Sequence, residues 1–104
     1  VVVLGEASPD SISRKTRLEI RSSRPGFLHW AVNGWKLPAK AHQVEGTRVS
    51  EDGSALQVPF SSSEKGKAFI AAIGPFQDSE GEVNLTAGYE DGSWESEAKT
   101  IRLS

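Results

Sequence analysis

The chain has 104 residues, of which 37% are hydrophobic, and 12 Lys and Arg residues stand against 14 Asp and Glu residues. This is the profile of one soluble domain, which at this length can bury a core without a metal or a disulfide. The net charge of -2 disfavours nucleic acid as a partner, because that ligand requires a basic stripe. The absence of cysteine leaves the cellular compartment open, because secreted domains with adequate cores also lack disulfides.

The N-terminal residues 1–4 form a short apolar run. It is too short for a signal or a membrane span, and no other run reaches the roughly 18 apolar residues that a span needs, so no membrane partner is expected. The run predicts a first strand instead. Because the chain begins with Val and contains no Met, we expect residues 1–104 to be a single domain excised from a larger protein.

The next two predicted strands cover residues 18–21 and 27–32. In the first, apolar and charged residues alternate, so its basic side chains are interpreted as a solvated strand face. The second is uncharged and ends at Asn33-Gly34, a turn signal. Because side chains alternate along a strand, we expect the core set to be Leu28, Trp30 and Val32 and the opposite set to be Phe27, His29 and Ala31.

A long loop is expected over residues 36–50, which show no clean period, and such loops often carry function. Further strands are predicted over 56–60 and 68–73, separated by a polar connection over 61–67. Two more, over 83–89 and 93–103, flank Glu90-Asp91-Gly92 and predict a hairpin.

Two four-residue segments, 51–54 and 90–93, have the same sequence, Glu-Asp-Gly-Ser. Asp-Gly supplies the backbone angles of a tight turn, so shared turn chemistry accounts for the repeat without a duplication. A glycosylation sequon occurs at 84–86. It falls within a predicted strand, where we expect Leu85 to face the core and Asn84 and Thr86 to face outward.

The fold class follows from the many short strands and from the absence of helical periodicity over three turns. About seven strands with regular turn signals predict an all-β fold, a two-sheet antiparallel immunoglobulin-like sandwich. Trp30 lies where the third strand of such a sandwich carries its core tryptophan. This comparison rests only on the position of Trp30 along the series of predicted strands.

Catalysis is disfavoured by the residues present. The closely spaced acids are interpreted as solvated, because a domain of this size has little room for an enclosed pocket; they are Asp78, Glu80, Glu82, Glu95 and Glu97. No nucleophile motif or phosphate-binding loop is present. Two histidines and no cysteine are too few for a transition-metal site, and turn roles account for Asp52 and Asp91, which could otherwise bind calcium. We therefore expect no enzymatic activity, no metal and no cofactor.

The strongest functional signal lies around the Asn33-Gly34 turn. Trp35 follows the turn and precedes Pro38, so its indole has no obvious place in the core. His29 is expected on the same side of the molecule, and the two rings would form a small apolar platform with polar edges. Trp94, directly after the second Asp-Gly turn, either covers the core or extends this platform.

The segment Leu28-His29-Trp30-Ala31-Val32-Asn33-Gly34-Trp35, followed by Pro38 and later by Pro59-Phe60, resembles starch-binding modules. Similar sequence patterns occur in carbohydrate-binding module family 25 of bacterial amylases and pullulanases and in the starch-binding modules of plant α-glucan water dikinases. The similarity covers 27–60, about a third of the chain. Ala31 departs from the glycine that many relatives have, and the C-terminal half does not align.

The resemblance implies a non-catalytic β-sandwich that binds α-1,4-glucan, a polysaccharide or oligosaccharide of the starch and glycogen type. His29 and Trp35 would be the ring platform, Asn33 and Lys36 its hydrogen-bonding neighbours, and Trp94 the best candidate for a second stacking aromatic. A covalently linked catalytic domain would be the natural partner. The localisation stays open, with an extracellular location as part of a secreted enzyme slightly favoured.

An alternative remains open at this point. The chain could be a structural immunoglobulin-like accessory domain whose Trp35 and Trp94 pack against a neighbouring domain or protein. Coplanar rings open to solvent would favour a sugar, whereas a convex apolar patch without polar neighbours would favour a protein partner.

Overall fold

The computed structural model describes residues 2–3, 10–38, 42, 46–62, 68–95 and 98–104. These residues form ten strands, four of them only two residues long. The strands are β1 Val2–Val3, β2 Ser11–Ile12, β3 Leu18–Ser22, β4 Gly26–Val32, β5 Arg48–Val49, β6 Leu56–Pro59, β7 Ser61–Ser62, β8 Phe69–Ile73, β9 Glu82–Tyr89 and β10 Lys99–Leu103.

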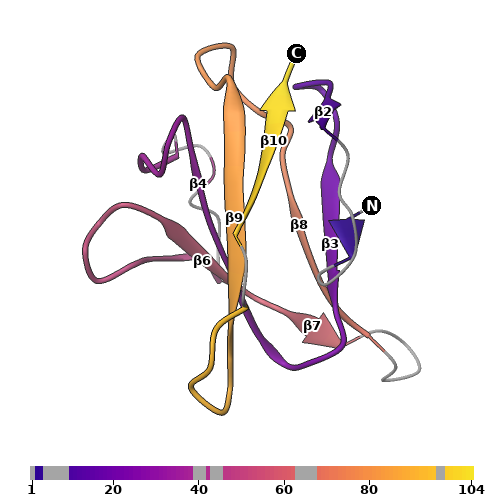
Figure 1. Ribbon diagram of the computed structural model, residues 1–104, viewed down its shortest axis with the longest axis vertical. Helices are drawn as coiled ribbons and strands as arrows, with labels where there is room; N and C mark the ends of the chain where they lie inside the picture. Colours follow the sequence, from indigo (N-terminus) through magenta and orange to yellow (C-terminus); the bar gives the residue numbers. More distant parts are fainter. Residues whose placement is uncertain (1, 4–9, 39–41, 43–45, 63–67, 96–97) are drawn as a thin grey trace.

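The strands form two sheets, with the orders β2-β10-β9-β4-β6-β5 and β1-β3-β8-β7. All pairs are antiparallel except β1 with β3 and β10 with β2. Figure 1 shows β6 running directly into β7, so the chain passes from the larger sheet to the smaller one at Phe60. The predicted all-β, two-sheet and mostly antiparallel class is confirmed, with ten described strands where about seven were expected.

The core lies between the two sheets. Leu18 and Ile20 of β3 and Ile73 of β8 contribute side chains from the smaller sheet, and all three are buried. From the larger sheet come Leu28, Trp30, Val32, Leu56, Val83, Leu85, Ile101 and Leu103. The predicted alternation along β4 is confirmed, because Leu28, Trp30 and Val32 all belong to this core.

The repeated turn sequence has the same local chemistry in both places, as predicted. The carboxylate of Asp52 accepts a hydrogen bond from the backbone N–H of Ser54 at 3.0 Å. That of Asp91 accepts one from Ser93 N–H at 2.9 Å. The glycine in each turn has a positive φ, as tight turns require.

Two predicted boundaries differ in the structure. The segment 36–50 was expected to be a loop, but Arg48–Val49 pairs with β6 as an edge strand, which is too short to show a period. The strand predicted over 93–103 is regular only in β10, and Trp94 makes an isolated bridge to Gly88. The expected first strand is described at Val2–Val3, and the expected polar connection is described only at Ser61–Ser62.

The prediction that the closely spaced acids are solvated is wrong for Glu80. Its side chain is buried, and it accepts a hydrogen bond from the backbone N–H of Gln77 at 2.6 Å and lies 2.9 Å from His42 Nε2. The His42 ring in turn packs edge-on against Trp30, with ring centroids 5.1 Å apart. Burial of a carboxylate requires such partners. His42 is 38 positions away from Glu80 in the sequence, so this contact could not be read from the spacing of residues.

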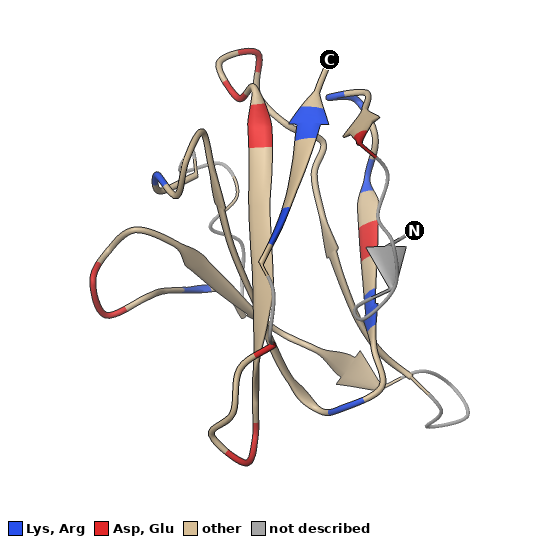
Figure 2. Ribbon diagram, viewed as in Figure 1, with Lys and Arg blue, Asp and Glu red and all other residues tan. Residues whose placement is uncertain are grey.

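Charged side chains are spread over the described surface. Figure 2 shows Lys and Arg positions interspersed with Asp and Glu positions over strands and turns of the described chain. On β3, Arg21 and Glu19 form the exposed ion pair of the predicted solvated face. No helix among the described residues is long and apolar enough to cross a membrane.

Replacing Trp30 tests the core assignment. The side chain is 1% exposed, so Trp30→Ala is expected to lower the free energy of unfolding by about 3 to 5 kcal/mol. No described residue accepts a hydrogen bond from its indole N–H, so Trp30→Phe should cost clearly less than the alanine change. Urea unfolding measures both, with Leu37→Ala at an exposed position as the control. Equal losses for Phe and Ala would contradict this account.

Candidate functional site

Four rings gather on the outer face of the larger sheet. Phe27 and His29 are the outward residues of β4, Trp35 follows the turn after β4, and Trp94 follows the turn after β9. The His29 ring centroid lies 5.8 Å from that of Trp35 and 5.3 Å from that of Trp94, and Phe27 lies 5.5 Å from Trp94. The structure therefore brings together the three predicted ring residues, His29, Trp35 and Trp94, which we call the ring cluster.

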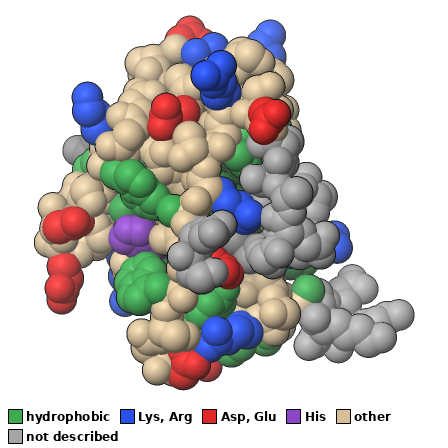
Figure 3. Space-filling view, viewed as in Figure 1, with side chains coloured by type: hydrophobic (Ala, Val, Ile, Leu, Met, Phe, Trp, Pro, Cys, Tyr) green, Lys and Arg blue, Asp and Glu red, His purple; other side chains and the backbone are tan. Residues whose placement is uncertain are grey.

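The ring cluster is accessible to solvent. Trp94 is 52% exposed, and His29 and Trp35 are half-buried. Figure 3 shows a histidine at the surface with hydrophobic side chains on either side of it. The sequence left open whether Trp94 covers the core, and its exposure places it on the surface.

The rings are open to solvent, but they are not coplanar, so this part of the arrangement expected for a sugar platform is not found. The planes of His29 and Trp35 are tilted by 34°, whereas Trp94 stands at 86° to His29. The three rings thus form a bent surface, in which His29 and Trp35 are the more nearly parallel pair and Trp94 stands almost perpendicular to His29. Such a shape can contact one ring of a ligand on its flat face and another part of it along an edge.

The backbone that carries Trp35 is unusual. Asn33, Gly34 and Trp35 all have positive φ, of 51°, 82° and 64°. A left-handed conformation is costly for a bulky residue such as tryptophan, and it persists only where the surroundings enforce it. The backbone N–H groups of Gly34 and Trp35 both donate to the side-chain oxygen of Asn84, at 3.0 and 2.9 Å.

Asn84 therefore holds the Trp35 loop from β9. Its side-chain NH₂ donates to Glu82 at 2.9 Å and to Thr100 at 3.1 Å, and the residue is only 2% exposed. The prediction that Leu85 faces the core is confirmed, but Asn84, which was expected to be an outward residue, is buried beneath the Trp35 loop. Its amide is enclosed, and these partners lie in the Trp35 loop, on β9 itself and on the neighbouring strand β10.

Trp94 is held by the hairpin that follows β9. Glu95 N–H donates to Ala87 at 2.8 Å, and the Arg24 side chain hydrogen-bonds both Asp91 and Ser93 at the tip of the hairpin. Gly88 beside the Trp94 bridge has a specific role. A Cβ at Gly88 would lie 2.4 Å from the Phe27 ring, so only glycine lets Phe27 lie across β9 and meet Trp94 edge-on.

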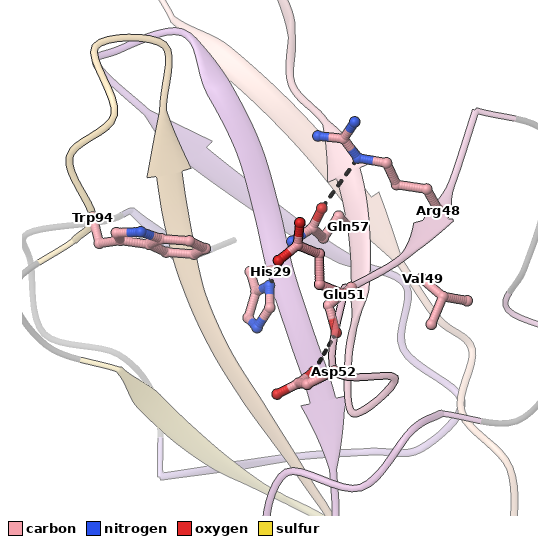
Figure 4. Close-up of a pocket in the computed structure, with 8 residues that line it drawn as sticks. His29, Arg48, Val49, Glu51, Asp52, Gln57 and Trp94 are labelled. Atoms are coloured by element: carbon pink, nitrogen blue, oxygen red, sulfur yellow. Dashed lines mark hydrogen bonds between the residues drawn. The ribbon is translucent and has the colours of Figure 1, made fainter.

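A groove runs beside the ring cluster. Its volume is about 550 Å³, and it is lined by His29, Arg48, Val49, Ser50, Glu51, Asp52, Gln57 and Trp94. Figure 4 shows Trp94 on one side, the β5–β6 hairpin on the other, and His29 between them. Trp35 is not among the lining residues, and it extends the surface beyond the groove from the far side of His29.

The polar side of the groove was missed by sequence reasoning. Arg48 and Gln57 lie on β5 and β6 and are connected by a hydrogen bond from Arg48 Nε to Gln57 Oε1 of 3.1 Å. A signal existed for Gln57, because it alternates with Leu56 and Val58 and so faces away from the core. Its place directly opposite His29 depends on the pairing of β4 with β6, which the sequence does not specify.

The structure places the other two predicted site residues as follows. The Asn33 amide accepts from Gly81 N–H at 2.8 Å and donates to the Ser79 carbonyl at 3.0 Å, so it ties its turn to the loop before β9. Lys36 is exposed, and its backbone forms a bridge with Val32. Contact of either side chain with a ligand stays a prediction.

Electrostatics fix the charges in the groove. Burial lowers the pKa of His29, and the nearby Asp52 carboxylate opposes this only in part. Hydrogen bonds from the Ser50 side chain, and from the Ser54 backbone and side chain, hold the pKa of Asp52 at about 2. At neutral pH the groove therefore presents a neutral imidazole, a carboxylate at Asp52 and the Arg48 guanidinium.

Within the described part of the chain, no three His, Cys, Asp or Glu side chains gather in a way that could hold a metal ion. The groove offers ring faces and hydrogen-bonding groups. Comparison with protein-family models, with curated proteins and with solved structures finds no match. The chemistry of the ring cluster and its groove is the remaining basis for a function.

Removal of the Asn84 side chain tests how the Trp35 loop is held. Asn84→Ala leaves the part-buried backbone N–H groups of Gly34 and Trp35 without their acceptor, so the free energy of unfolding should fall by about 1 to 3 kcal/mol. Hydrogen exchange of these two amides should accelerate more than that of core amides. Thr100→Val, which removes one contact of Asn84, is the milder control. Unchanged exchange at residues 34 and 35 would contradict the assigned role.

Proposed function

We propose that this domain is a non-catalytic carbohydrate-binding module whose ligand is an α-glucan of the starch or glycogen type. The observation that carries the proposal is the ring cluster. The ring centroids of Trp35 and Trp94 each lie within 6 Å of that of His29 on one accessible face, next to a groove with polar side chains.

The chemistry of a sugar fits this surface. A pyranose has an apolar face of C–H groups that packs on an aromatic ring, and hydroxyls at its rim that require donors and acceptors. His29 and Trp35 offer flat faces, while Gln57, Arg48 and Asp52 lie at the rim of the groove. An apolar patch for a protein partner would be expected to lack this polar border.

The bent shape favours an α-linked chain. Successive units of an α-1,4-glucan turn along a curve, so neighbouring rings present faces at an angle, whereas a β-1,4-glucan is an extended ribbon. The tilt of 34° between His29 and Trp35 and the upright Trp94 match a curved ligand better than a flat one.

Two further observations support the proposal. The spacing of His29, Trp30, Asn33 and Trp35 resembles that of family 25 starch-binding modules. The sheet orders are the second observation, and from them we infer an immunoglobulin-like topology, in which β1-β3-β8-β7 would take the place of strands A-B-E-D and β4, β9 and β10 that of C, F and G. Trp30 then occupies the place of the core tryptophan of strand C.

A shallow open site of this kind binds weakly, with a dissociation constant of roughly 1 mM to 1 μM. Linkage to a catalytic domain, together with repeated binding sites along one polysaccharide chain, would raise the apparent affinity by multivalency. The domain would thus hold an attached enzyme on its substrate and leave the chemistry to that enzyme.

Affinity electrophoresis tests the ring cluster directly. Trp35→Ala and Trp94→Ala are expected to remove most of the retardation of the domain in gels that contain amylopectin or glycogen, because each removes a stacking face. Leu37→Ala is a matched control, since Leu37 is an exposed apolar residue outside the cluster. Circular dichroism confirms that each variant is folded.

Unchanged mobility of the folded Trp35→Ala protein would refute the proposal for that residue. Wild-type protein that is not retarded by any α-glucan, or that binds a soluble β-1,4-glucan equally well, would refute the ligand class. If no α-glucan retards the wild-type protein, the accessory-domain alternative, with Trp94 covered by a neighbouring domain, would be the better explanation.

The salt dependence of binding separates a neutral ligand from an anionic one. Because a glucan carries no charge, its dissociation constant should change less than about 2-fold between 50 mM and 500 mM NaCl in a titration followed by tryptophan fluorescence. A steep loss of affinity with salt would indicate an anionic partner that contacts Arg48 or other cations.

A further inference from the structure

A line of three hydrogen-bonding side chains crosses the groove behind the ring cluster. Arg48 Nε donates to Gln57 Oε1 at 3.1 Å, and Gln57 Nε2 lies 3.1 Å from His29 Nδ1. These residues come from β5, β6 and β4, and the strand register places Gln57 opposite both Arg48 and His29. Figure 4 shows Gln57 between Arg48 and His29.

The chemistry of the donors fixes the direction of this line. An arginine guanidinium has donors and no acceptor, so the Gln57 atom that faces Arg48 must be the oxygen. The NH₂ group of Gln57 then faces His29, and because it can only donate, His29 Nδ1 must accept. A neutral imidazole carries one proton, so with Nδ1 as acceptor the proton lies on Nε2.

We propose that Arg48 and Gln57 are positioning residues that keep His29 neutral and in the Nε2–H form, so that Nε2 donates a hydrogen bond to a ligand oxygen. No described residue accepts a hydrogen bond from His29 Nε2, which leaves this donor for the ligand. The recognition part of this proposal rests on the proposed function, but the protonation state of the free protein does not.

The line of hydrogen bonds from Arg48 through Gln57 to His29, which we call the relay, is sensitive to acid. Protonation of His29 places a hydrogen on Nδ1, where it faces the NH₂ of Gln57, and Gln57 cannot turn its oxygen to His29 without turning its NH₂ to Arg48. The charged groups around the ring are Asp52 and Glu51 in the β5–β6 turn and Arg48 on β5. The facing β4 and β9 neighbours and the two indoles are uncharged.

The direction of the pH effect follows from these contacts. Burial lowers the pKa of His29 below its ordinary value of 6.5, and a ligand that covers the ring removes more water from it and disfavours the cation further. Affinity should therefore be constant above pH 6.5 and decline as the pH falls through the lowered pKa of His29. Folding stability should also decline between 6.5 and that lower value.

The first test reads the relay in the free protein. Long-range ¹H–¹⁵N correlation spectra assign the protonated nitrogen of a histidine, and at pH 8 we expect His29 to be in the Nε2–H form. In Gln57→Glu the new carboxylate accepts from Nδ1, so the ring should change to the Nδ1–H form and the pKa of His29 should rise. Gln77→Glu makes the same change at an exposed turn outside the groove and should leave His29 unaltered.

The second test reads recognition. At pH 8, Gln57→Glu is expected to bind maltoheptaose between about 2- and 10-fold more weakly than wild type, as expected for the loss of one hydrogen bond, while Gln77→Glu binds normally. Isothermal titration calorimetry from pH 5 to 8 should give the predicted decline for wild type. Asp52 remains ionised over this range, because its pKa is about 2.

Three results would overturn the inference. An Nδ1–H ring in wild type would refute the relay, and a Gln57→Glu protein with reversed protonation but unchanged affinity would refute its part in recognition. Affinity that stays constant as His29 titrates would do the same. If wild type binds no polysaccharide, the proposed function and the recognition step fail together, while the spectra of the free protein still decide the relay.

Discussion

The two faces of strand β4 connect the hydrophobic core to the ring cluster. Leu28 and Trp30 point into the space between the sheets, and the residues between and beside them, Phe27 and His29, point to solvent. Strand β4 lies between β9 and β6, so its outward residues have neighbours on both sides. The same backbone that fixes Trp30 in the core therefore fixes the height and direction of the His29 ring, which is the centre of the ring cluster.

The strained, left-handed backbone of Trp35 is stabilised by hydrogen bonds to a buried polar residue. Its left-handed backbone lies on Asn84, whose own side chain is anchored to Glu82 and Thr100. A stretch of three positive φ angles would not persist in an isolated peptide, so the loop depends on β9 being in place. Strain at a candidate site that is held by a rigid neighbour is typical of a preorganised surface.

Features set by local sequence were predictable. The alternation along β4, the Asp-Gly turns and the exposure of the basic residues on β3 follow from residue spacing of two to four positions, and the structure agrees with each. His29 and Trp35 are near in sequence, so their meeting could also be expected. For Trp94 the sequence left two positions open, covering the core or extending the platform, because its contact with His29 depends on the register of β9 against β4.

Features set by distant residues were not predictable. Glu80 was expected in solvent because nothing near it in sequence reveals that His42 packs against it. Asn84 was assigned to the outer face, and its role under the Trp35 loop required the position of a turn 50 residues earlier. Gln57 showed a strand pattern, but only the strand register reveals that it lies between a guanidinium and an imidazole.

The three tryptophans occupy different surroundings, so their fluorescence can distinguish the core of the domain from its surface. Trp30 is sealed from water, whereas Trp94 is half open to it and Trp35 lies between these extremes. A collisional quencher such as acrylamide therefore reaches two of the three indoles while the chain is folded. Emission that remains in the presence of the quencher comes from Trp30 in the core, and emission that is lost comes from Trp35 and Trp94 in the ring cluster. One spectrum therefore reports separately on the folded core and on the accessibility of the ring cluster.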